Sequence, residues 1–158
     1  MKTFLQRLSI HHDLSLKIRV LGMAVAGWVT LMAVAQLFKY EEFPGVIDKL
    51  WEAGGSSAAH ILAAAIVVCE VFSLPFLLNM KVTPLVRAVS IVCGWFTASV
   101  WLVIALWQAA ASSMVLNQGY FGATLPIAND WIVLLLALAL GVGTTFMTVL
   151  VYRSRKTA

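Results

Sequence analysis

The chain has 158 residues, of which 61% are hydrophobic and only 11% are charged, and its formal net charge is +4. Soluble domains usually carry about 25% charged residues, so water alone cannot solvate a surface this poor in charge. The composition therefore excludes an ordinary soluble domain. No basic stretch exceeds a few residues, so nucleic acid is not an expected partner.

The apolar residues form continuous runs that are long enough to cross a bilayer as α-helices, each near the roughly 20 residues that about 30 Å of hydrocarbon requires. A membrane β-barrel would instead show alternating polarity in short strands. We therefore expect an all-α integral membrane four-helix bundle, a single domain over residues 1–158 in contact with the lipid bilayer. The spans are Val20–Phe38, Ala58–Leu78, Ala88–Trp107 and Trp131–Tyr152.

The first span follows a polar lead of about 16 residues. Ala33-Val34-Ala35 resembles a signal-peptidase site. The apolar run continues past it to Phe38, so we expect the first helix to be retained. After this span, apolar residues at helical spacing lie opposite charged ones in Phe43–Ala53, which predicts a short amphipathic helix. It would lie on the outer membrane surface, or it would simply cover the mouth of the bundle, and these two arrangements are compatible.

The second span contains Glu70, which lies roughly 18 Å into the membrane at 1.5 Å per residue. A carboxyl group at this depth is costly and is by default a candidate functional group. No lysine or arginine shares its depth, so the neutral acid is expected. Its candidate partners are polar and uncharged: Ser73, Gln36, Thr30, Thr97 and Thr145. A protonated interhelical bridge and a role in ligand binding or proton relay both stay open.

Asn79–Pro84 predicts a tight turn, so the second and third spans should form an antiparallel hairpin. That hairpin brings Cys69 and Cys93 to similar depth. They are interpreted first as small buried side chains, and a redox pair is the alternative. Trp95 and Trp101 of the third span are interpreted as packing or lipid-facing residues, or as apolar walls of a ligand site.

The last connection, Asn117–Asp130, is the longest and has no basic residue. Small residues every four positions within the spans predict close helix packing. These stripes are Gly22/Ala26/Thr30, Ser90/Gly94/Ala98 and Ala137/Gly141/Thr145. An outer aromatic belt is expected from Trp51, Trp107, Tyr120 and Trp131, and an inner one from Tyr152.

The basic residues predict the orientation. Nine of the eleven flank the N-terminus, the Asn79–Pro84 turn and the C-terminus, and only Lys39 and Lys49 lie on the other side. The positive-inside rule therefore places both termini in the cytoplasm. The histidines (His11, His12 and His60) do not share a depth, so no metal or haem site is expected.

The pattern as a whole resembles the DoxX/MauE group of small four-helix bacterial membrane proteins. The resemblance covers most of the chain and is carried by Arg19, Gly22, Lys39, Phe43, Glu70, Gly119, Phe121, Gly122 and Asp130. Gln118-Gly119-Tyr120-Phe121-Gly122 is similar to the Cys-Gly-Cys-Phe-Gly stretch of MauE-type members, with both cysteines replaced. The resemblance implies the bacterial cytoplasmic membrane and an association with redox systems.

Three functions follow as expectations. The first is a membrane subunit, not necessarily an enzyme, that docks or supports a redox partner at the outer face, with no cofactor of its own. The second is a quinone- or thiol-linked oxidoreductase component, with a possible quinone bound between helices near Glu70. The third, a small-solute carrier, has the least support, since four spans with one buried charge offer few polar groups for a pathway.

Overall fold

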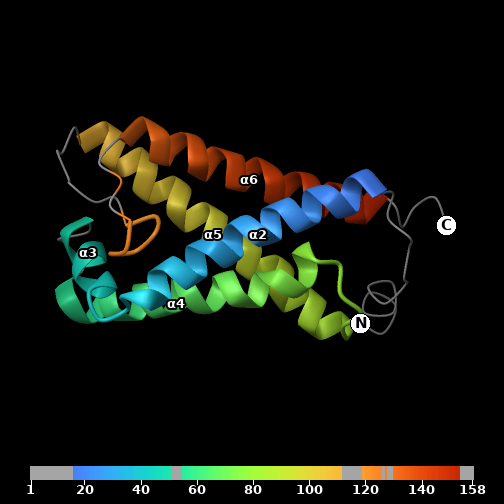
Figure 1. Cartoon of the computed structure of the whole chain (residues 1–158), viewed down its shortest axis with the longest axis horizontal. Helices are drawn as coiled ribbons and strands as arrows, with labels where there is room; N and C mark the ends of the chain where they lie inside the picture. The colour runs from blue at the N-terminus through green and yellow to red at the C-terminus, as the bar shows by residue number, and fades with distance from the viewer. Residues whose placement is uncertain (1–15, 51–54, 112–118, 126, 128–129, 154–158) are drawn as a thin grey trace.

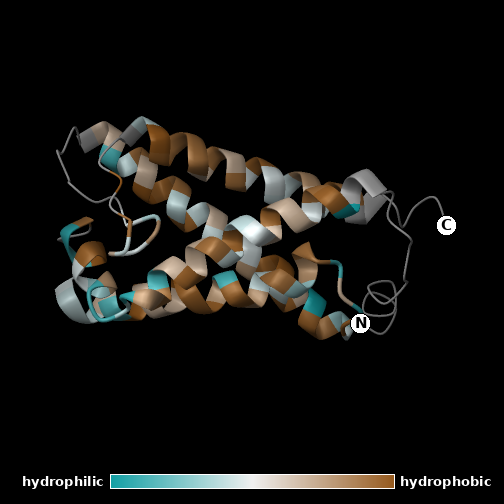
Figure 2. Ribbon diagram, in the orientation of Figure 1, coloured by the Kyte–Doolittle hydropathy of each residue, from teal (hydrophilic) through white to brown (hydrophobic). Residues whose placement is uncertain are grey.

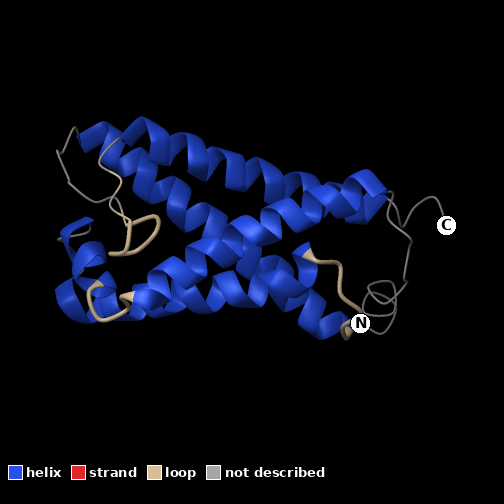
Figure 3. Ribbon diagram, viewed as in Figure 1, coloured by secondary structure: helices blue, strands red, loops and turns tan. Residues whose placement is uncertain are grey.

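A computed structural model describes residues 16–50, 55–111, 119–125, 127 and 130–153. The described residues form helices and no strand, apart from a single bridge between Phe121 and Leu125, which confirms the all-α prediction for this part of the chain (Figure 3). The helices are α2 (Leu16–Phe38), α3 (Phe43–Leu50), α4 (Gly55–Leu77), α5 (Pro84–Ala111) and α6 (Asp130–Arg153).

The four long helices run up and down as a bundle (Figure 1). α4 packs against α2 and α5, α5 packs against α6, and α6 returns to α2, so the long helices close a ring. α3 lies at one end of the bundle, where it packs against α4. This closed ring gives every long helix two neighbours.

Four helices are long and apolar enough to cross a membrane, namely Arg19–Phe38, Gly55–Leu77, Pro84–Ala110 and Trp131–Leu150. They correspond to the four predicted spans. Brown, hydrophobic residues predominate along these four helices in Figure 2. Large apolar side chains such as Phe38, Ile61 and Leu135 are more than half exposed, as expected where lipid rather than water surrounds the protein.

The turn between α4 and α5 has the predicted tight form. Asn79 adopts a left-handed backbone conformation with φ of 49°, which ends α4. Thr83 caps α5, because its Oγ1 accepts a hydrogen bond from the Val86 amide at 3.4 Å, and Pro84 occupies the first turn. These local signals make α4 and α5 an antiparallel hairpin.

Helix α3 covers the predicted amphipathic segment as far as Leu50, and residues 51–53 lie outside the described part. Phe43, Ile47 and Leu50 are at most 5% exposed, whereas Lys49 faces outward. The apolar face is therefore buried against the protein. The helix therefore covers one end of the bundle, and its position relative to a membrane surface stays a prediction.

The predicted small-residue stripes differ in how far their members are buried. Ser90, Gly94 and Ala98 are all buried, as predicted. Thr30 and Thr145 are exposed, and their hydroxyls donate to the carbonyls of Ala26 and Gly141 on their own helices. The α6 stripe prediction was therefore wrong beyond Ala137, because the buried face of that helix consists of Val133, Ala137, Leu140, Thr144 and Met147.

Candidate functional site

Glu70 lies on α4 with its side chain fully enclosed, at 0% exposure. Its Oε1 accepts a hydrogen bond from Gln36 Nε2 at 3.1 Å and another from Trp101 Nε1 at 3.2 Å. The donors come from α2 and α5, so one carboxyl oxygen joins three helices. The other oxygen, Oε2, has no hydrogen-bond partner among the described residues.

Gln36 extends this network toward the end of the bundle that carries α3. Its Nε2 also donates to the backbone carbonyl of Tyr120 at 3.1 Å. Tyr120 belongs to the described segment 119–125, which thus inserts between the helices. Irregular backbone inside a membrane protein needs protein partners for its polar groups, and Gln36 supplies one. The network therefore links the enclosed carboxyl group of Glu70 to a loop.

Two glycines give the inserted segment its shape. Gly119 and Gly122 have φ of 73° and 63°, and the Gly122 amide donates to the Gly119 carbonyl at 2.8 Å. A Cβ atom at Gly122 would lie 2.8 Å from Gln36 Cα, closer than real Cβ contacts. Only glycine fits both the backbone conformation and this approach to α2. The spacing of the Gly-Tyr-Phe-Gly sequence thus places two aromatic residues between the two turns.

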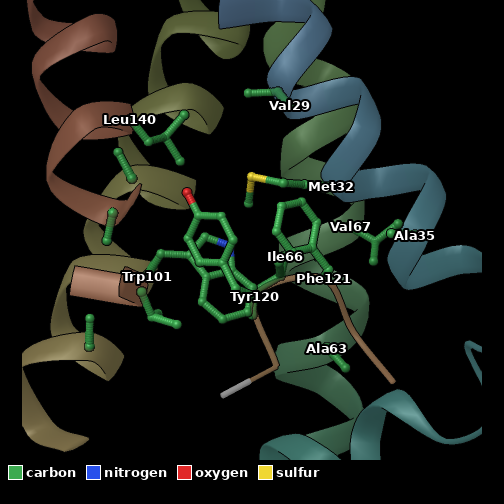
Figure 4. Close-up of a cluster of buried hydrophobic side chains, with 14 of the residues drawn as sticks. Val29, Met32, Ala35, Ala63, Ile66, Val67, Trp101, Tyr120, Phe121 and Leu140 are labelled. Atoms are coloured by element: carbon green, nitrogen blue, oxygen red, sulfur yellow. The ribbon is translucent and has the colours of Figure 1, made fainter. Parts of the chain in front are cut away.

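The two aromatic residues fill the interior beside Glu70. The Tyr120 ring lies 5.1 Å from that of Trp101 and 5.4 Å from that of Phe121, centroid to centroid (Figure 4). Trp28 Nε1 donates to the Tyr120 hydroxyl at 3.4 Å. Burial raises the pKa of the Tyr120 phenol above its ordinary range. These aromatic rings thus form a packed, mainly apolar cluster beside the Glu70 carboxyl group.

This geometry corrects the prediction for Tyr120. An outer aromatic belt requires a ring at the bilayer surface, but Tyr120 is 0% exposed because the Gly119 and Gly122 turns direct it into the bundle. Trp107 and Trp131 are 65% and 71% exposed, which suits belt residues. Trp51 and the Tyr152 side chain lie outside the described residues.

The sequence did not identify Trp101 as a partner of Glu70. It is buried at 0% exposure and donates directly to the carboxyl group, rather than facing lipid. A usable signal was present, since Trp101 lies one helical turn from Thr97 on the same face of α5. Trp95 is 41% exposed and lies away from this cluster.

Of the uncharged candidate partners, Gln36 alone among the described residues bonds to the Glu70 carboxyl group. Ser73 Oγ donates to the Glu70 backbone carbonyl at 2.7 Å. Thr97 is 2% exposed, and its hydroxyl has no hydrogen-bond partner within the described residues. Thr30 and Thr145 bond to their own helices, as described above. The predicted set therefore separates into one direct partner and several residues with other roles.

The positions that carry the family resemblance are spread along the bundle. Gly22 is where α2 approaches α4, because a Cβ there would lie 2.5 Å from the Leu77 carbonyl oxygen. Lys39 pairs with Glu42 at 3.6 Å on the surface, and Phe43 is buried. Arg19 is exposed. Asp130 begins α6, and its side chain lies outside the described residues.

Other chemistry-bearing groups lie apart from Glu70. Arg87 Nη2 bonds to Asn79 Oδ1 at 3.2 Å and to the Met80 carbonyl at 3.1 Å, which ties the α4–α5 turn to α5. His60 is exposed near the start of α4. No group of three metal-binding side chains occurs within the described ranges. Cys69 and Cys93 are free thiols of intermediate exposure.

Two apolar grooves open on the flank of the bundle. One, of about 530 Å³, lies between α3, α4 and α5, where Leu50, Leu62 and Val103 contribute to its walls. The second, of about 590 Å³, lies between α5 and α6 and includes Trp95. Glu70 lines neither groove. The enclosed carboxyl group and the ligand-sized spaces are therefore separate features.

Comparisons with family models, with curated proteins and with solved structures find no match to this chain.

Proposed function

We propose that the chain is a DoxX-like integral membrane subunit that docks or supports a redox partner at the outer face of the bacterial cytoplasmic membrane. The observation that carries this proposal is the Gln36 amide, which bonds both to Glu70 and to the Tyr120 carbonyl. The polar groups inside the bundle thereby hold one end of it in a fixed shape. A docking surface benefits from such support, because a rigid surface loses less entropy on binding.

The proposed docking surface consists of α3 and the residues just before it. Its inner side is anchored by Phe43, Ile47 and Leu50. Its outer side carries charges of both signs on exposed residues: Lys39, Glu41, Glu42 and Lys49. A polar surface of this kind suits a non-obligate protein contact better than contact with hydrocarbon.

The distribution of basic residues supports the proposed orientation. With both termini and the Asn79–Pro84 turn in the cytoplasm, α3 and residues 119–125 lie on the outer side. The outer location of α3 and the bacterial membrane belong to the proposal, and the family resemblance favours both.

Photo-crosslinking in native membranes tests the docking function. A photoreactive residue at Gly45 has open space around it, because no atom lies within 4 Å of a Cβ built there. We expect it to capture one protein that carries a flavin, haem, metal or redox-active thiol. The matched control is the same residue at Met80, which is 49% exposed at the opposite end. An adduct that forms equally from Met80, or a Gly45 partner without a redox group, contradicts the proposal.

The second candidate is an oxidoreductase component that binds a quinone between helices. The groove between α3, α4 and α5 favours it, since its apolar walls suit an isoprenoid chain. An absorption spectrum and a lipid extract of the purified protein test this function. A stoichiometric quinone whose retention falls when Val103→Trp fills the groove supports it, and a quinone-free extract from quinone-containing membranes contradicts it.

A further inference from the structure

The buried face of α5 is polar from the α4–α5 turn to the level of Glu70. Its members follow one another at alternating steps of three and four positions, which place them in one line along the helix: Arg87, Ser90, Gly94, Thr97 and Trp101. Ser90, Thr97 and Trp101 are at most 2% exposed. Polar groups inside hydrocarbon are costly, so a line of them within a candidate membrane span indicates a function.

The packing of α4 against α5 brings Glu70 level with Thr97. Ser73 on α4 faces Gly94 on α5, since the Ser73 Cβ lies 3.6 Å from the position that a Cβ on Gly94 would occupy. Three residues further from the turn, the same antiparallel register pairs Glu70 with Thr97, because both helices rise equally per residue. The hydrogen bond from Trp101, one turn beyond Thr97, to the Glu70 carboxyl group agrees with this register.

Four buried oxygen atoms of the described bundle have no hydrogen-bond partner in it: Glu70 Oε2, Gln36 Oε1, Thr97 Oγ1 and Ser90 Oγ. Buried polar atoms are usually paired, so these atoms mark a place that binds a proton or water. Both N–H donors to Glu70, from Gln36 and Trp101, bond to Oε1, which leaves Oε2 to carry the proton of the neutral acid. The Thr97 and Ser90 hydroxyls can each donate and accept a hydrogen bond.

Hydroxyl groups lead from Glu70 toward the α4–α5 turn. Beyond Thr97, the side chains of Ser73 on α4 and Thr144 on α6 both approach the Gly94 level, and Ser90 lies one helical turn further. Successive levels are about 5 Å apart along the axis, a distance that one water molecule spans with two hydrogen bonds.

The opposite side of Glu70 is closed by aromatic rings. Trp28, Tyr120 and Phe121 pack there with ring centroids 5.4–6.4 Å apart (Figure 4). Among the buried residues of the described bundle, Glu70 is the one acidic side chain, and the basic one, Arg87, bonds to the turn. A polar route for the proton therefore leads toward the turn, and the aromatic cluster blocks the other direction.

We propose that Glu70 is a buried proton-binding site, and that the polar face of α5 is a half-channel through which this proton exchanges with water on the side of the α4–α5 turn. The O–H bond at Oε2 breaks as the proton passes to a water molecule bonded to Thr97, and transfers past Ser90 deliver it to the turn. The Gln36 and Trp101 N–H groups stabilise the carboxylate until a proton returns by the same path. The half-channel does not depend on the docking function, because it uses neither α3 nor a protein partner.

Infrared spectroscopy of the full-length protein in lipid nanodiscs tests this path. The C=O stretching band of a neutral carboxylic acid shifts when deuterium replaces its proton, and Glu70→Gln identifies the band that belongs to this residue. After transfer into D2O we expect the Glu70 band to shift. Thr97→Val and Ser90→Ala should each slow the shift by about tenfold or more, the effect of losing one hydrogen bond on the path. Thr97→Ser keeps the hydroxyl and should retain the parent rate.

Matched variants show whether the direction of the path is correct. Thr145→Val removes an exposed hydroxyl of α6, and Tyr120→Phe removes the hydroxyl on the aromatic side, so neither should slow the shift. A missing acid band, a band that never shifts in D2O, or a parent-like rate in either Thr97→Val or Ser90→Ala would overturn the proposal. Slowing by Tyr120→Phe or Thr145→Val that equals the slowing by Ser90→Ala would overturn it as well. Circular dichroism checks the fold of each variant, and Ser90→Ala, which removes one oxygen atom, decides alone should Thr97→Val not fold.

Discussion

Glu70 is held by neutral donors rather than by a counter-charge. Gln36 and Trp101 both donate to the same carboxyl oxygen, and Ser73, about one turn along the same helix, bonds to the Glu70 backbone carbonyl instead. Buried hydrogen bonds contribute modestly when made and cost more when one partner is removed. The effect of a substitution at Glu70 therefore depends on which of its two donors is left without an acceptor.

Glu70→Ala should destabilise the protein, whereas Glu70→Gln should remain close to the parent. Alanine leaves the Trp101 indole N–H without its acceptor, which costs about 1–3 kcal/mol in addition to the cavity. Glutamine retains an acceptor oxygen and nearly the same volume. The free energy of unfolding in mixed micelles, followed by circular dichroism, measures both. Equal loss in the two variants would show that the carboxyl group itself, rather than its acceptor role, stabilises the bundle.

Gly122→Ala and Gly27→Ala should change stability in opposite directions. Alanine at position 122 must adopt φ near 63°, which costs roughly 1–2 kcal/mol, and its Cβ collides with Gln36. Gly27 has a helical backbone and no atom within 4 Å of a built Cβ, so alanine there should stabilise α2 by up to about 1 kcal/mol. Thermal unfolding in detergent compares them. A neutral Gly122→Ala variant would argue against the inserted loop.

At the scale of elements, the sequence predicted the helices and turns that depend on continuous or local residue patterns. The four spans follow from uninterrupted apolar runs, and the α4–α5 turn follows from Asn79, Thr83 and Pro84, whose preferences act locally. The inserted segment 119–125 could not be predicted this way. The position of this segment within the bundle depends on a contact between Gly122 and Gln36, which are far apart in sequence. The ring contact between Tyr120 and Trp101 is likewise long-range, and no local sequence pattern predicts it.

Gly22 sets the spacing between α2 and α4, and a substitution there tests this role. Gly22→Ala places a methyl group 2.5 Å from the Leu77 carbonyl and 2.9 Å from Met147 Cε, so α2 must move away from α4. Overpacking of this kind typically costs about 1–3 kcal/mol. Gly141→Ala is the control, since nothing lies within 4 Å of its Cβ. Unfolding titrations should show a loss for the first variant only, and a similar loss for both would mean that close α2–α4 packing is not what Gly22 provides.

At the scale of the whole molecule, the described bundle separates two kinds of surface. Its flanks are apolar along the four candidate spans, and its ends carry the exposed charged residues, with Glu41 and Glu42 before α3 and Lys81 in the opposite turn. A bilayer is the environment that matches this division, because hydrocarbon solvates the flanks and water solvates the ends. The two ends should therefore be accessible from opposite sides of a membrane.

Single cysteines introduced at the two ends measure this orientation. In a background with Cys69→Ser and Cys93→Ser, a cysteine at the exposed Glu41 should react with a membrane-impermeant maleimide in intact cells. A cysteine at Met80 should react only after the membrane is permeabilised, because the positive-inside rule predicts a cytoplasmic position for the turn that carries Lys81 and Arg87. The reverse pattern would invert the bundle, move α3 to the cytoplasmic side and remove the basis for an outer docking surface. Reaction of both positions in intact cells would contradict a membrane-spanning bundle altogether, since the same reagent would then have reached both of its ends from one side.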